Sequence, residues 1–133
     1  MENISVHDSH ILKYVVDYEK KEIILNTKSE DNESIDIVFS DVVAYLFEDA
    51  IIGCIILDLE EWPIDDVIGC LGEDYIMKHK SYGWPFEFET IDDFKNKVAK
   101  DEIIIYNLAS SYGMSGFIFA KSVKYLTKNT IKK

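Results

Sequence analysis

The chain has 133 residues and a mass of 15.4 kDa, enough for one core that buries about two thirds of the surface exposed by the unfolded chain. Hydrophobic residues make up 47% and aromatic residues 13%, which excludes global disorder despite a net charge of -11. All basic residues are lysines, so the chain lacks the bidentate donor that reads guanine edges and phosphates, and its charge repels polyanions. Nucleic-acid binding is therefore disfavoured.

The sequence carries no recognisable targeting segment. Its first eight residues contain neither a basic region nor a long apolar run, and so predict no secretory signal. The longest apolar stretch, 50–57, is far shorter than the roughly 20 residues that cross a bilayer as a helix. Cys54 and Cys70 lie in apolar sequence and are expected to be reduced core thiols. We therefore expect a cytoplasmic protein without membrane contact.

The first half of the chain has the composition of short strands separated by polar turns. Segment 41–50 is ambiguous, because its apolar residues fit one face of a helix as well as a strand. Its β-branched and aromatic content favours a strand, with a bulge near Ser40 and Asp41. We expect an N-terminal antiparallel meander of four to five strands over the segments 11–18, 22–27, 35–40, 41–50 and 53–60.

A helix is expected to begin near Pro63, since proline suits the first helical position and the acidic pair that follows it suits the first turn. Gly69 and Gly72 weaken this helix and could break it in two. A second helix is expected over 91–100, with Thr90 as its N-cap.

Two further strands, 103–108 and 117–126, are separated by a small-residue turn and predict a C-terminal β-hairpin. The order of strands, one or two central helices and a hairpin predicts an α+β fold with an antiparallel sheet. We expect residues 1–133 to form a single globular domain, with 127–133 as a frayed tail.

Charge is polarised along the sequence. Residues 1–74 hold 19 acidic residues and 4 lysines, whereas residues 75–133 hold 6 acidic residues and 10 lysines. Between 29 and 77 there are 14 acidic residues and no basic one. These carboxylates form either a solvated surface that keeps the protein in solution or a docking face for a basic partner. The candidate binding face comprises Glu48, Asp49, Asp58, Glu60, Glu61, Asp65, Asp66, Glu73 and Asp74.

One segment invites a chemical interpretation, because His7, Asp8 and His10 could contribute to a divalent metal site. The signal is weak, since a closed site needs further ligands and the two histidines would point to opposite faces of a strand. An ordered turn explains the segment better. We assign no catalytic residue, metal or cofactor, and a small metal-dependent hydrolase using His7, His10 and nearby carboxylates is kept as an alternative.

Four segments together, 7–10, 39–45, 56–61 and 110–117, resemble small acidic bacterial proteins associated with toxin-immunity loci. The similarity is one of pattern and extends over most of the chain. It implies a binding protein that neutralises a cognate toxin by occlusion. It supplies no catalytic residues.

The leading functional hypothesis combines the charge pattern with this resemblance. We expect a non-catalytic protein-binding module, an immunity protein whose acidic face covers a basic toxin such as a nuclease. Besides the hydrolase, a structural protein that forms homodimers through an uncovered sheet edge is a further alternative.

Overall fold

The computed structural model describes residues 7–48, 53–80, 84 and 86–127. Within these residues the chain forms eight strands and three helices. They are β1 (His10–Asp17), β2 (Glu22–Lys28), β3 (Ser34–Ser40), β4 (Ala44–Glu48), β5 (Ile55–Trp62), α1 (Ile64–Leu71), α2 (Glu73–Lys78), α3 (Ile91–Lys100), β6 (Ile104–Tyr112), β7 (Ser115–Ala120) and β8 (Ser122–Thr127).

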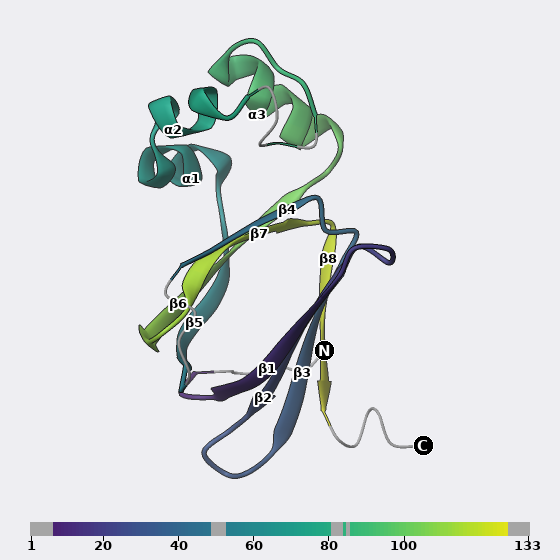
Figure 1. Cartoon of the computed structure of the whole chain (residues 1–133), viewed down its shortest axis with the longest axis vertical. Coiled ribbons are helices and arrows are strands. Elements are labelled where there is room, and N and C mark those ends of the chain that lie inside the picture. The colour runs from purple at the N-terminus through teal and green to yellow at the C-terminus, as the bar shows by residue number, and fades with distance from the viewer. Residues whose placement is uncertain (1–6, 49–52, 81–83, 85, 128–133) are drawn as a thin grey trace.

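All strands belong to one antiparallel sheet with the order β4-β7-β6-β5-β1-β2-β3-β8. The sheet bends at the junction of β5 and β1, where the described residues are paired only at His10 and Ile55. Its two halves therefore face each other, while the three helices lie together at one end of the molecule (Figure 1). The sheet and separate helices confirm the expected α+β class.

The chain passes between the two halves of the sheet at one corner. Lys121 alone separates β7 from β8, and its backbone N–H donates to the Ser40 carbonyl at 3.1 Å. Asp41, which follows β3, has a φ of 55°, and the Val43 N–H then donates to the Phe119 carbonyl at 2.8 Å. Both connections turn sharply here, so β4 and β7 lie in one half and β3 and β8 in the other.

The pairing differs from the expected meander, whereas β6 and β7 pair as an antiparallel hairpin, from Ile104 with Ala120 to Leu108 with Gly116. The first three strands pair in chain order, but β4 pairs with β7 and β5 pairs with β6. The expected strand 117–126 is divided at Lys121 into two strands in different halves. Three helices are described, because the helix after Pro63 is divided at Gly72, one of the two glycines expected to weaken it, where φ is 93°. The expected frayed tail lies outside the described residues, apart from Thr127.

Two apolar clusters stabilise this arrangement. The first fills the space between the two halves of the sheet, where Ile37 and Phe39 of β3 join Leu108 and Ile118 from the opposite half. The second lies between the helices and the outer face of the β4–β7–β6–β5 half, and it includes Phe94 of α3. Cys54 belongs to the first cluster, whereas Cys70 is exposed, so the expectation of a core thiol was wrong for Cys70. Other residues form the apolar side of α1, the short helix that contains Cys70.

The N-cap of α3 is formed as its sequence predicts. The Thr90 hydroxyl accepts a hydrogen bond from the Asp93 N–H at 3.1 Å, and the Asp93 carboxylate accepts one from the Glu89 N–H at 2.9 Å. The helix is thereby fixed where Phe94 and Val98 enter the second cluster.

Replacement of Thr90 by alanine should lower the free energy of unfolding by about 1 kcal/mol, because an N–H of the first helical turn loses its acceptor. Urea denaturation of the wild type and of Thr90→Ser measures the effect, since serine restores the hydroxyl. Equal stability of Thr90→Ala and Thr90→Ser would contradict the assigned cap.

Candidate functional site

Seven of the nine candidate acidic residues lie on three consecutive elements, although Glu60 and Glu61, which are adjacent in β5, point to opposite faces of the strand. Three lie on β5 and four lie in the first turns of α1 and α2, which follow β5 directly. All seven side chains are exposed. We call this set the acidic surface: Asp58, Glu60, Glu61, Asp65, Asp66, Glu73 and Asp74.

The two remaining candidates are not part of the acidic surface. Glu48 ends β4, which is separated from β5 by β7 and β6, so its backbone is about 14 Å from β5 at the usual strand spacing. Asp49 lies outside the described residues.

One ammonium group lies within the acidic surface. Lys95 of α3 donates to the Asp65 carboxylate at 2.8 Å. This hydrogen bond and the charge of Asp65 raise the pKa of Lys95, and Asp92 and Glu73 raise it further through their negative charges. Among the described residues, Asp65 is the only member of the acidic surface with an ammonium within 4.0 Å. The other carboxylates are therefore available to an external cation.

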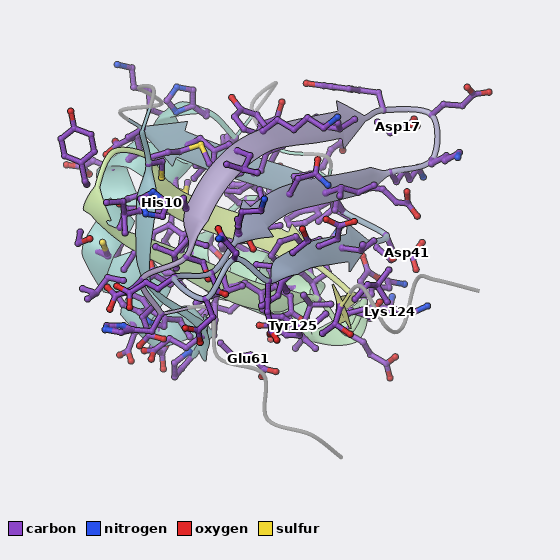
Figure 2. All side chains as sticks on the ribbon, turned by 90° about the horizontal axis from the view of Figure 1, so that it is seen from below. His10, Asp17, Asp41, Glu61, Lys124 and Tyr125 are labelled. Atoms are coloured by element: carbon purple, nitrogen blue, oxygen red, sulfur yellow. The ribbon has the colours of Figure 1, made fainter. Side chains whose placement is uncertain are left out.

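The acidic residues on β5 also influence two tyrosines of the cluster between the halves of the sheet. Burial raises the pKa of Tyr106 to about 12, and the charge of Glu61 contributes. Burial also raises the pKa of Tyr125, with contributions from Asp58 and Glu61. Glu61 and Tyr125 lie near each other in the view of Figure 2. Both tyrosines are therefore held in their neutral form.

These shifts predict how stability depends on alkaline pH. The ordinary pKa of tyrosine is 10.0, so the stability contributed by neutral Tyr106 is complete below pH 10 and is lost as the pH rises through about 12. Tyr106→Phe should remove up to about 2 kcal/mol of this alkaline loss. Urea unfolding at several pH values between 9 and 12 measures it. A variant with the same pH dependence as the wild type would contradict the assignment.

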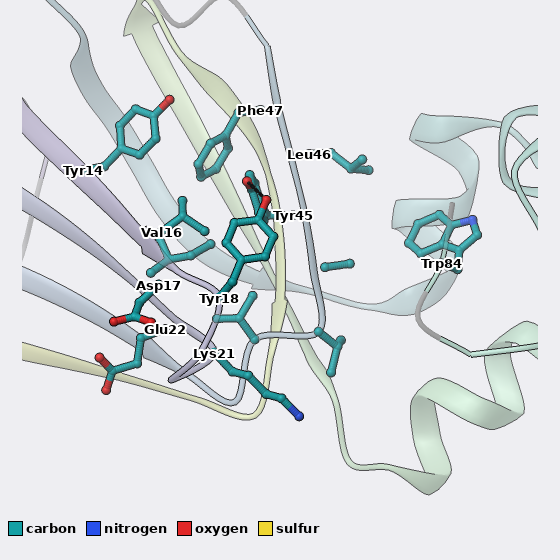
Figure 3. Close-up of a pocket in the computed structure, with 14 residues that line it drawn as sticks. Tyr14, Val16, Asp17, Tyr18, Lys21, Glu22, Tyr45, Leu46, Phe47 and Trp84 are labelled. Carbon is teal, nitrogen blue, oxygen red and sulfur yellow. Dashed lines mark hydrogen bonds between the residues drawn. The ribbon is translucent and has the colours of Figure 1, made fainter. Parts of the chain in front are cut away.

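A groove of about 810 Å³ runs between β1, the β1–β2 turn and β4. Four consecutive residues of β4, 44–47, line it. Because consecutive side chains of a strand point to opposite faces, the groove follows the edge of β4 instead of covering one face. In Figure 3, Tyr45 and Phe47 are directed toward Tyr14 and Tyr18, whereas Leu46 is directed toward Trp84.

Aromatic side chains cross this groove. The hydroxyls of Tyr18 and Tyr45 are 2.8 Å apart and hydrogen-bonded, and the rings of Tyr14 and Phe47 meet edge to face with centroids 5.6 Å apart. The hydrogen bond to Tyr18 is the main cause that raises the pKa of Tyr45 to about 12. Tyr18 is nevertheless 78% exposed and Tyr14 41% exposed, so the groove offers aromatic surface to a partner.

The histidine segment has a local structural role. The His7 ring nitrogen Nδ1 is hydrogen-bonded to the Leu57 carbonyl, and Nε2 lies 3.4 Å from the Asp8 carboxylate. The nearby N–H of Asp8 donates to the Ile56 carbonyl at 2.7 Å, which attaches this segment to β5. The described part of the chain contains no group of three or more histidine, cysteine or acidic side chains arranged to hold a metal ion. Nor do the described helices include one with the length and apolarity to span a bilayer.

Comparison of the sequence with protein-family models and with curated proteins finds no match. The functional argument therefore depends on the acidic surface and the groove. The aromatic groove was not anticipated from the sequence. The only signal for it was the concentration of aromatic residues at the end of β1 and in β4, which does not indicate that these two strands face each other.

Proposed function

We propose that the protein is a non-catalytic binding module, an immunity-type protein that neutralises a basic toxin by covering it with the acidic surface. The observation that carries this proposal is the set of seven exposed carboxylates, of which Asp65 alone contacts an ammonium among the described residues. Exposed carboxylates without neighbouring ammonium groups create a negative field, and a cationic partner is attracted by that field. The same field steers the partner during encounter.

The arrangement also favours a protein over a small ligand. The acidic residues occupy a strand and two successive helices, and a hollow of about 280 Å³ next to them is lined by Glu61, Lys95 and apolar side chains. Exposed carboxylates distributed over a strand and two helices suit a macromolecular partner better than a single small ligand. The proposal also includes a cytoplasmic location for the protein, where it would meet the toxin.

The experiment that tests this function is co-expression with a basic toxic protein, sought first among the products of the genes that flank this one. The proposal expects cells to survive only when both proteins are produced, and the two purified proteins to elute as one complex from a sizing column. Continued toxicity together with separate elution would refute it. If the complex protects cells and shows no hydrolase activity, the hydrolase alternative is also excluded.

A further inference from the structure

We propose that the ion pair between Lys95 and Asp65 is an autoinhibitory contact. The ammonium of Lys95 occupies the position on the acidic surface that a lysine or arginine side chain of the partner takes, and the partner must displace it. This inference rests on the proposed function, since it takes the partner to be a basic protein. It assigns to Lys95 a regulatory role, which is to lower the affinity of the acidic surface for cations.

Lys95 reaches the acidic surface from a different part of the chain. It lies in α3, and its Nζ donates to Oδ1 of Asp65 in α1 at 2.8 Å. Lys80 also forms an ion pair, but with Glu89, which is not part of the acidic surface. Among the described lysines, Lys95 is therefore the one whose ammonium lies within 4.0 Å of the acidic surface.

Carboxylates from three helices act on this ammonium. Asp65 lies in the first turn of α1, Glu73 in the first turn of α2 and Asp92 in the first turn of α3. The hydrogen bond to Asp65 and the charge of Asp65 raise the pKa of Lys95, and the charges of Asp92 and Glu73 add to this effect. The ammonium therefore lies where the negative fields of three helix ends overlap, and such a position attracts a partner's cation as well.

Other contacts fix the two helices that the pair joins. α3 is held by the Thr90 cap and by Phe94, and α1 is held by Val67, which lies with Phe94 in the second apolar cluster. The side chains of Lys95 and Asp65 are 34% and 73% exposed. Ion pairs at exposed sites contribute little to stability. The pair can therefore be replaced by a contact with the partner while both helices stay folded.

A hollow beside α3 leaves room for the displaced lysine. Its volume is about 280 Å³, and Lys95 lines it together with Trp62, Val98 and Ile103. The methylene stem of a lysine lies favourably along apolar surface of this kind while its ammonium stays in water. Lys95 can therefore leave Asp65 by rotation of its side chain alone, with the backbone of α3 in place.

The test measures the affinity of the folded full-length protein for a capped hexalysine peptide, by titration calorimetry at low salt. Lys95→Met should lower the Kd of this peptide by about threefold or more, because the competing ammonium is removed. Lys95→Gln should give the same gain, which excludes an attraction between the peptide and the methionine side chain. Weaker binding by these variants would show that Lys95 supports the acidic surface, and would overturn the inference.

Lys97 provides the matched control. It lies two residues further along α3, about 200° around the helix axis from Lys95, and no described carboxylate is within 4.0 Å of its ammonium. Lys97→Met removes the same charge and should change the Kd by less than about twofold. Equal gains in Lys95→Met and Lys97→Met would be an effect of net charge and would also overturn the inference.

Asp65→Asn tests whether the two cations compete for this carboxylate. In a protein that carries Asp65→Asn, the further change Lys95→Met should alter the Kd by less than about twofold, because the shared acceptor is absent. The full threefold gain in this background would contradict competition at Asp65.

The same variants separate this inference from the proposed function. If toxin is neutralised but Lys95→Met and Lys97→Met bind both toxin and peptide with equal Kd values, this inference fails and the proposed function stands. If Lys95→Met binds the peptide more tightly as expected but no toxin is neutralised, the proposed function fails and the competition at Asp65 stands.

Discussion

Replacing Gly116 with alanine is expected to lower the free energy of unfolding by about 3 kcal/mol, at the upper end of the cost of overpacking. A Cβ at this position would be 1.8 Å from the Leu46 carbonyl oxygen and 3.0 Å from the Cα of Phe47. These are backbone atoms of β4, so no side-chain rotation relieves the clash. β4 must move away from β7, and the groove between β1 and β4 loses one wall.

Gly69 provides the matched control for this substitution. It lies within α1, and a Cβ there would meet nothing within 4 Å. Gly69→Ala should raise stability by up to about 1 kcal/mol, since alanine is the better helix former. Urea denaturation of both variants gives the difference, and hydrogen exchange of 44–48 locates it. If Gly116→Ala were as stable as the wild type and kept its β4 amides protected, β4 and β7 would not approach each other as closely as described.

Reversing two charges of the acidic surface is expected to weaken toxin binding by about 100-fold or more. Glu60→Lys and Asp66→Lys replace exposed carboxylates with ammonium groups, so an attraction to a basic partner becomes a repulsion, and like-charge contacts across an interface cost several kcal/mol. Titration calorimetry with the purified toxin measures the change in Kd. Co-expressed toxin should kill cells that carry this variant.

The control for charge reversal is Glu30→Lys with Asp31→Lys. These exposed residues lie in the turn between β2 and β3, at the end of the molecule opposite the helices (Figure 1). The two pairs of substitutions change the net charge equally, so a nonspecific effect of net charge would weaken binding to the same extent in both. We expect the control variant to retain the wild-type Kd within about threefold, since it leaves the proposed contact intact. Equal loss in both variants would argue against a localised face.

Local sequence signals predicted the elements better than their arrangement. The cap and the apolar spacing of α3 both lie within residues 90–100, so Thr90, Phe94 and Val98 predict this helix from local sequence. Within segment 41–50, whose β-branched and aromatic content favoured a strand, residues 44–48 form one. Its partner could not be predicted, because pairing with β7 depends on Gly116, about 70 residues later in the chain, where the absence of a side chain permits the close approach.

The acidic surface could also be predicted from the sequence, because it too depends on local order along the chain. The acids of β5, α1 and α2 follow one another in the chain, so their proximity follows from short connections. Glu48 was grouped with them by sequence distance, but the crossing of β4 to the far edge separates it. The groove depends on Tyr14 and Tyr45, which are brought together only by the bend of the sheet. Long-range topology of this kind leaves no local pattern.

The association rate of the protein with the toxin, measured by stopped flow over a range of salt, tests the central claim most directly. If exposed carboxylates of the acidic surface attract a basic partner, the wild-type rate should fall about tenfold or more between about 0.05 and 0.5 M salt, because ions screen exposed charges at these distances. Glu60→Lys with Asp66→Lys should start slower and change little. A wild-type rate that is independent of salt would contradict the account.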